Sequence, residues 1–394
     1  MPVRPTPTIS RVAFTALLAA AMAMATFAGP AFAVLARFII DDLGLTRAEL
    51  GWVVAAFSAV GALASPSIGR VTDVLGGRRT LAAVFLLSGL GLVSISVAPG
   101  YWWLFAAAVL TGLGQASANP GTNKLISVHI PVGRRGAVTG LKQSGVQIGV
   151  FLAGLLLPTG ALAWGWRTTL AIVGAVSILT LVAVRLVVPP DVQPTKTPGR
   201  TTTTVWTPPI IWLTSYGFLM GAAGGAVNTY IPLYGEEAIG LTVTAAGLVA
   251  GVAGLIAFFA RIWWARHSEQ SGDYVLALTW IAGLSVAFVG ALLAAETGGE
   301  WLLWVGALGL GASATAWNAV GMLAVMVFAG REQSGGASGV VLLGFLAGLG
   351  LGPPAFGWSV DELDSYAPGL IAALFTFLLA TLLATRWRRK QVPA

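Results

Sequence analysis

The chain has 394 residues, of which 56% are hydrophobic and only 9% are charged, and it contains no cysteine. Soluble domains carry about 25% charged residues, so this composition excludes an ordinary soluble protein and predicts an all-α integral membrane protein. The absence of cysteine excludes disulfide and thiolate chemistry. The formal net charge of +7 raises the question of nucleic-acid binding, which the positions of the basic residues must decide.

Twelve stretches are long and apolar enough to be membrane-spanning helices, each of which needs about 20 mainly apolar residues. The expected spans are 12–36, 48–69, 80–98, 102–127, 137–158, 166–188, 209–231, 242–265, 274–295, 301–328, 337–357 and 366–386. The first stretch also resembles a cleaved secretory signal, with a basic start, an apolar run and a small-residue end. We expect it to be retained, because its removal would leave eleven spans and break the internal repeat.

The interval 189–208 is rich in proline and threonine, has no apolar periodicity, and is expected to be a cytoplasmic linker. It separates a six-helix N-terminal half, 1–188, from a six-helix C-terminal half, 209–394. The halves resemble each other: GRVTDVLGG at Gly69 parallels ARHSEQSGD at Ala265, and GLGQAS at Gly112 parallels GLGASA at Gly309. Such a repeat predicts two pseudo-symmetric halves, the architecture of rocker-switch transporters.

Basic residues gather on one side of the predicted spans, which the positive-inside rule identifies as the cytoplasmic side. The opposite side carries most of the acids, which are Asp41, Asp42, Glu49, Glu236, Glu237, Glu296, Glu300, Asp361, Glu362 and Asp364. The basic charge is therefore a topology signal and does not indicate nucleic-acid binding. We expect a multi-pass protein of the plasma membrane with both termini in the cytoplasm.

The segment GRVTDVLGGRR, between the second and third spans, resembles the loop signature of the major facilitator superfamily. That signature has a glycine, three residues, an aspartate, two residues, a glycine and then bases. The matching residues here are Gly69, Asp73, Gly76, Arg78 and Arg79. The family usually has a base directly after the aspartate, and Val74 departs from that pattern. The resemblance implies that Asp73 helps to latch the two halves on the cytoplasmic side; the alternative is a topogenic loop with one capping acid.

We take a small set of basic residues to lie at membrane depth, and no acid falls clearly inside a predicted span. They are Arg37, Lys124, Lys142 and Arg261. Lys142 is placed about 9 Å inside its span, at about 1.5 Å per residue. Its stem could reach the headgroups, but Gln143 and Gln147 lie beside it, and amides gain nothing by facing lipid. We therefore expect Lys142, Gln143 and Gln147 to line an aqueous cavity.

The fourth span has a polar face of its own. Gln115, Asn119 and Asn123 recur at intervals of four and are followed by Lys124. In the superfamily that the chain resembles, the first, fourth, seventh and tenth spans line the central path. Lys124 is expected to be an entrance charge or an interfacial anchor. Arg37, near the outer end of span one, is expected to pair with Asp41 and Asp42 or to contact an anion.

The second half contributes mainly amides and aromatic residues. Its expected substrate-binding residues are Asn228, Tyr230, Trp317 and Asn318. Arg261 ends the eighth span and is expected to anchor it, although the family resemblance offers an anion contact at that level.

No catalytic, metal or cofactor site is predicted, because the two histidines, His129 and His267, lie far apart in the sequence. The leading hypothesis is a monomeric secondary transporter of a small organic anion, such as a carboxylate, that works by alternating access with proton-coupled uptake or exchange. The first alternative is a proton-driven drug exporter. Such exporters generally need a membrane acid, and Val150 stands where their signature has a proline. A non-transporting receptor or scaffold is the second alternative.

Overall fold

The computed structural model describes residues 11–131, 134–191 and 206–391, and within these residues every regular element is a helix. The helices are α1 (Arg11–Thr26), α2 (Ala28–Val34), α3 (Ala36–Leu43), α4 (Arg47–Leu75), α5 (Gly77–Ser96), α6 (Tyr101–His129), α7 (Arg135–Trp164), α8 (Trp166–Val187), α9 (Pro208–Glu237), α10 (Val243–Ser271), α11 (Tyr274–Gly298), α12 (Glu300–Ala312), the short 3-10 helix η2 (Ala314–Ala316), α13 (Trp317–Leu363) and α14 (Ala367–Gln391).

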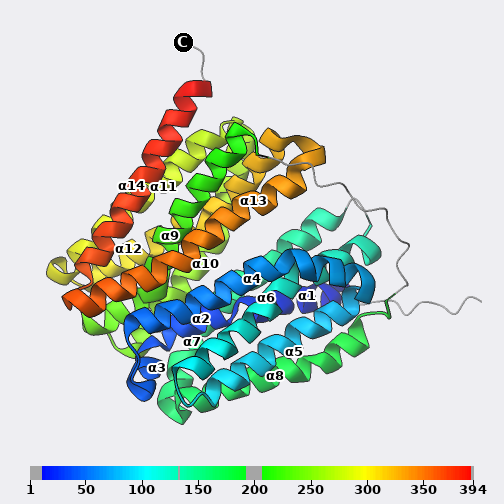
Figure 1. Ribbon diagram of the computed structural model, residues 1–394, viewed down its shortest axis with the longest axis horizontal. Helices are drawn as coiled ribbons and strands as arrows, with labels where there is room; N and C mark the ends of the chain where they lie inside the picture. Colours follow the sequence, from blue (N-terminus) through cyan, green and yellow to red (C-terminus); the bar gives the residue numbers. More distant parts are fainter. Residues whose placement is uncertain (1–10, 132–133, 192–205, 392–394) are drawn as a thin grey trace, which may run out of the picture.

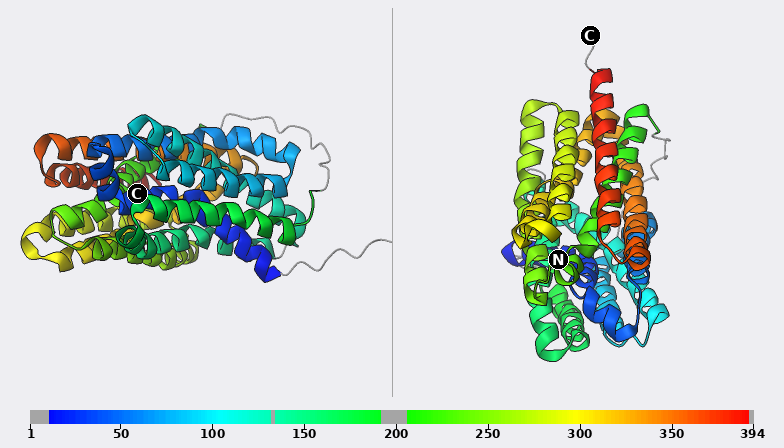
Figure 2. Two further views of the ribbon diagram at one scale, coloured as in Figure 1. Left: turned by 90° about the horizontal axis from the view of Figure 1, so that it is seen from below. Right: turned by 90° about the vertical axis from the view of Figure 1, so that its left-hand side faces the viewer.

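The helices form two groups, α1 to α8 and α9 to α14 (Figure 1). In the first group α5 packs on α6 and α8, α4 on α6, and α1 on α7; in the second, α13 packs on α9, and α11 on α12 and α14. The groups meet where α4 contacts α13 and where α7 contacts α10. Helix α14 projects beyond its neighbours at one end of the molecule (Figure 2). Most of the predicted linker, 192–205, lies outside the described residues.

Ten described helices are long and apolar enough to cross a membrane, and α1 with α2, bent by 51°, makes an eleventh span. The remaining predicted span, 102–127, is α6, whose polar residues lower its hydropathy. Its 29 residues at about 1.5 Å each still exceed the hydrocarbon thickness of about 30 Å. The chain is therefore a multi-pass, all-α membrane protein.

The first predicted span, 12–36, is broken instead of straight. Pro30 has no N–H to donate to the carbonyl of Thr26, four residues earlier, and the helix breaks at that point. The Thr26 hydroxyl donates back to Met22 O at 2.9 Å. Thr26 of α1 and Pro30 of α2, on either side of the break, both line the cavity described below.

The tenth predicted span, 301–328, is interrupted between α12 and α13. Side chains of α10 satisfy carbonyls that the interruption frees: Trp264 Nε1 donates to Ala312 O at 2.9 Å, and Arg261 Nε donates to Thr315 O at 3.1 Å. Irregular backbone at membrane depth is tolerated where other groups satisfy it in this way.

The seventh span is longer than predicted. The expected range, 209–231, ends before Pro232, whereas α9 continues through Pro232 to Glu237. Glu236 therefore lies in the last turn of a membrane helix, and its residue is only 6% exposed. The prediction that no acid lies within a span was wrong.

The two groups touch closely at the end that carries α3 and the start of α4. We call this the outer end, because the charge distribution predicts that it faces away from the cytoplasm. A Cβ added to Gly154 of α7 would lie 2.6 Å from the backbone nitrogen of Gly251 of α10, and one at Gly51 of α4 would lie 2.7 Å from the Pro354 nitrogen of α13. Glycine at these positions lets the backbones of the two groups pack against each other.

Candidate functional site

A cavity of about 320 Å³ lies between the two groups of helices. Side chains from α1, α2, α4, α6 and α7 face others from α9, α10, α12, η2 and α13. Among the described residues that line the cavity, Arg261 alone is charged. None of the described lining residues is an acid that could neutralise this positive charge, so the charge of the chamber is complementary to an anion.

The Arg261 side chain is held in place by contacts with Thr315 and Gln147. Its Nε donates to Thr315 O, and, in the amide orientation that satisfies both groups, Gln147 Oε1 accepts from Nη1 at 2.9 Å and from Nη2 at 3.2 Å. The Gln147 amide nitrogen then donates to Gly254 O at 3.1 Å. The expectation that Arg261 anchors the end of its span was wrong, because α10 continues ten residues further to Ser271 and Arg261 faces the cavity.

Other predicted residues also line this cavity. They are Gln115, Gln147, Asn228, Trp317 and Asn318. The buried Oε1 of Gln115 has no hydrogen-bond partner among the described residues. Trp317 is 2% exposed and packs on Phe345, with ring centroids 5.1 Å apart. The cavity thus combines one guanidinium with amides from both groups of helices.

Lys142 does not line the cavity in this structure, which corrects the prediction. The residue is 0% exposed, and its Nζ donates to Thr122 Oγ1 at 2.7 Å, to Asn123 Oδ1 at 2.7 Å and to Asn119 Oδ1 at 3.2 Å. All three acceptors belong to α6, so Lys142 joins α7 to α6. The ammonium neither reaches towards headgroups nor meets open space, because three oxygen atoms replace its water.

The amide-bearing residues around Lys142 are exposed, although Lys142 itself is buried. Asn119, Asn123 and Gln143 are all exposed, and Gln143 Nε2 lies 3.5 Å from Asn119 Oδ1. The polar face predicted for the fourth span is therefore divided: Gln115 faces the central cavity, while Asn119 and Asn123 cover Lys142.

Truncating Lys142 should destabilise the fold. Lys142→Ala leaves an unfilled volume and the buried Thr122 hydroxyl without its donor, so we expect a loss of about 2–4 kcal/mol and a lower melting temperature in detergent. Lys124→Ala is the matched control. The Lys124 side chain is 32% exposed, so its removal should leave the melting temperature almost unchanged. An unchanged melting temperature together with abolished transport in Lys142→Ala would instead return Lys142 to the substrate site.

The predicted latch loop makes its contacts within the first group of helices. Asp73 Oδ1 pairs with Lys124 Nζ at 3.1 Å, and the Asp73 side chain is 72% exposed. Asp191 accepts from the backbone nitrogens of Arg78 and Arg79, at 2.8 and 3.1 Å, and so caps the N-terminus of α5. Gly76 takes φ = 91° between α4 and α5, where a side chain would be strained, while Gly69 has open space around it. A latch between the halves through these residues stays a prediction for another conformation.

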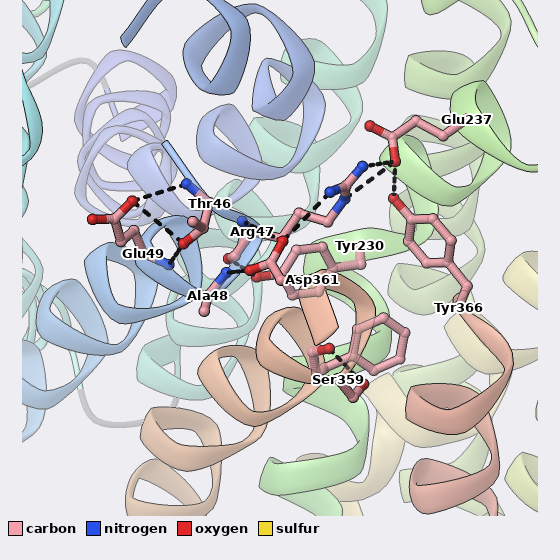
Figure 3. A network of polar contacts seen from close by, with 10 residues as sticks. Thr46, Arg47, Ala48, Glu49, Tyr230, Glu237, Ser359, Asp361 and Tyr366 are labelled. Atoms are coloured by element: carbon pink, nitrogen blue, oxygen red, sulfur yellow. Dashed lines mark hydrogen bonds and ion pairs between the residues drawn. The ribbon is translucent and has the colours of Figure 1, made fainter. Parts of the chain in front are cut away.

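A network of polar contacts joins the two groups of helices at the outer end and closes it (Figure 3). Arg47, at the start of α4, donates to Glu237 Oε2 from Nη2 at 2.6 Å and from Nε at 3.2 Å. Its Nη1 lies 3.4 Å from Asp361 Oδ1. Asp361 also accepts from the backbone nitrogens of Arg47 and Ala48, at 3.0 and 2.8 Å. We call Arg47, Glu237 and Asp361 the outer clasp.

Two tyrosines donate hydrogen bonds to residues of the outer clasp. Tyr366 OH donates to Glu237 Oε2 at 2.6 Å; burial, together with the hydrogen bond to Glu237, raises the pKa of Tyr366, so its hydroxyl stays protonated. Tyr230 donates to Arg47 O and stacks on Phe356. Tyr230 therefore contacts the outer clasp and does not line the cavity, contrary to the prediction.

Arg37 also lies at the outer end, away from the cavity. Its Nε is 3.8 Å from Asp41 Oδ2, and its Nη1 is 3.9 Å from Glu236 Oε2. Asp42 pairs with Arg167 instead, at 2.9 Å. The sequence reasoning missed the outer clasp and Glu236. Arg47 could have been noticed as one of very few bases on the acid-rich side.

Comparison with known proteins identifies the family. Residues 16–324 match the sequence model described as Major Facilitator Superfamily. The chain is 25% identical over 149 residues to the hexuronate transporter of Bacillus subtilis (strain 168), covering 38% of this chain and 35% of that protein, so the match spans about a third of the relative's length. It is 28% identical over 360 residues to the probable nitrate/nitrite transporter NarK2 of Mycobacterium tuberculosis (strain ATCC 25618 / H37Rv), covering 86% and 87% of the two chains.

The fold also resembles a solved structure. The crystal structure of a bacterial homolog of the human lysosomal transporter Spinster, in an inward-facing and unoccupied conformation, aligns with a TM-score of 0.78 over 97% of both chains at 18% identity. The family match covers more than half of the chain, and the helical architecture agrees with it. The chain therefore belongs to the Major Facilitator Superfamily, and the two relatives described above are named as transporters rather than as enzymes.

Proposed function

We propose that the protein moves a small organic anion, in the first place a carboxylate, through the central cavity by alternating access. The observation that carries this proposal is the guanidinium of Arg261, the one charged group among the described residues that line the cavity. An arginine fork matches the two oxygens of a carboxylate and binds it with two parallel hydrogen bonds.

The surroundings of Arg261 suit a ligand of this kind. The Gln147 amide oxygen occupies two of the guanidinium donors, and a carboxylate that displaces it would offer those donors a charged acceptor. Asn228 and Asn318 supply further donors from α9 and α13. The volume of about 320 Å³ is at the small end of the range of ligand pockets, which runs from about 300 to 1,000 Å³.

The relatives support an anion as substrate. The names of the two relatives above specify hexuronate and nitrate or nitrite, both of which are anionic. The cavity has no described acid in its lining, whereas an exporter of cationic compounds would need one to hold its substrate. Proton-coupled uptake or exchange by a monomer, in a plasma membrane with both termini in the cytoplasm, completes the proposal.

The proposal is tested by measuring binding and flux with the purified full chain. We expect at least one compound from a panel of sugar acids, aromatic monocarboxylates and dicarboxylates to raise the melting temperature by several degrees, because a ligand that binds the native state stabilises it. The same compound should show saturable counterflow in proteoliposomes. Binding and flux of lipophilic cations alone would favour the exporter, and activity with nitrate alone would restrict the substrate to inorganic anions.

A further inference from the structure

Glu236 is a buried carboxyl group that the proposed transport site does not use. It lies in the last turn of α9, its side chain is 1% exposed, and its Oε2 has no hydrogen-bond partner among the described residues. The nearest described cation is the guanidinium of Arg37, 3.9 Å from Oε2, and half of the Arg37 side chain is exposed. This distance exceeds hydrogen-bond contact, so Arg37 compensates a negative charge on Glu236 only partly.

The other charges near Glu236 oppose its ionisation. Asp41 of α3 and Glu237, the next residue of α9, both act on it electrostatically. The positive charge of Arg47 on α4 is already engaged by Glu237 and by Asp361 of α13. A carboxylate that loses its water without gaining hydrogen bonds is costly, and a neutral carboxyl group is much less so.

The contact between Glu236 and Arg37 crosses the boundary between the two groups of helices. Arg37 belongs to α3 in the first group, and Glu236 belongs to α9 in the second. The neighbouring Glu237 makes the cross-boundary pair with Arg47 (Figure 3). Separation of the groups at the outer end would part Glu236 from Arg37 and admit water to the carboxyl group.

We propose that Glu236 is the proton-binding site of the outer gate: a proton taken up from the external side neutralises the carboxylate and so favours the closed outer end. This inference rests on the alternating-access function proposed above. The proton adds to a Glu236 carboxylate oxygen while the outer end is open. When the outer end reopens, release of the proton to water restores the negatively charged carboxylate. Acid outside then favours the conformation seen here, and alkaline conditions favour the open outer end.

The test measures the separation of the outer ends as a function of pH. Because the chain has no cysteine, Val97→Cys and Glu362→Cys, at exposed positions on the outer ends of the two groups, provide two unique sites for spin labels. In lipid nanodiscs we expect the short-distance population to grow at least threefold relative to the long-distance one between about pH 8 and pH 5.5. In Glu236→Gln, which mimics the neutral form, the short-distance population should dominate at every pH.

Glu300→Gln is the matched control, because Glu300 is an exposed acid at the same end of the molecule and its neutralisation should leave the pH response unchanged. A wild-type distribution that does not change with pH, an opening on acidification, or a pH response that survives in Glu236→Gln would overturn the proposal. Gel filtration of each variant shows whether it is folded. Counterflow at constant pH tests the transport function separately, so a chain without flux but with a Glu236-dependent response would refute only the proposed function.

Discussion

Replacing Arg261 with alanine is expected to lower kcat/KM for the transported anion by at least about 100-fold while the protein remains in the membrane. A hydrogen bond to a charged group contributes about 1.5–3 kcal/mol, and a carboxylate held by the arginine fork would lose two of them. The melting-temperature shift caused by the ligand should disappear as well. This second measurement reports binding directly, without the conformational steps of transport.

Arg261→Lys should separate charge from geometry. Lysine keeps the positive charge but offers a point charge in place of a planar fork, so we expect an intermediate loss of about tenfold. Arg266→Ala is the matched control: Arg266 lies five residues later in α10, is exposed, and does not line the central cavity. Normal transport by Arg261→Ala would refute the anion site, and equal losses in Arg261→Ala and Arg266→Ala would point to a general effect of basic charge.

Hydropathy alone predicted most of the fold, because lipid requires each span to be long, apolar and internally hydrogen-bonded. The prediction failed where a helix continues through a proline, or where side chains of another helix satisfy backbone groups that the helix itself does not. The predicted seventh span, 209–231, ends before Pro232, whereas α9 continues through Pro232 to Glu237. The interruption near Ser313 has no strong sequence signal, because the donors that satisfy it, Trp264 and Arg261, come from another helix.

The candidate site was only partly predictable, because the sequence shows which side chains are polar but not which helix each one faces. The spacing of polar residues at every fourth position in α6 correctly indicated a polar face. Lys142 of α7, however, donates hydrogen bonds to that face and does not line the cavity. Arg261 could not be placed until the true length of α10 was known. A charge within a span indicates either a substrate contact or a satisfied internal bond, and only the three-dimensional packing distinguishes them.

Arg47→Gln is expected to weaken the closed outer end and shift the protein towards the outward-open conformation by about 5- to 30-fold. Arg47 makes two hydrogen bonds to Glu237 and an ion pair with Asp361, all of them between the two groups of helices. The Arg47 and Glu237 side chains are 26% and 27% exposed. Solvent screening therefore limits the contribution to about 1–2 kcal/mol. The spin-label distance between Val97→Cys and Glu362→Cys should lengthen accordingly.

Arg167→Gln provides the matched control for charge at the outer end. Arg167 pairs with Asp42 at 2.9 Å, but α8 and α3 belong to the same group, so breaking that pair should leave the distance distribution unchanged. The exchange of Arg47→Glu with Glu237→Arg should restore part of the closed population, because it reverses both charges of one pair. If Arg47→Gln and Arg167→Gln behave alike, the outer clasp does not hold the gate. The closed end must then depend on the glycine contacts of Gly51 and Gly154, where backbone meets backbone.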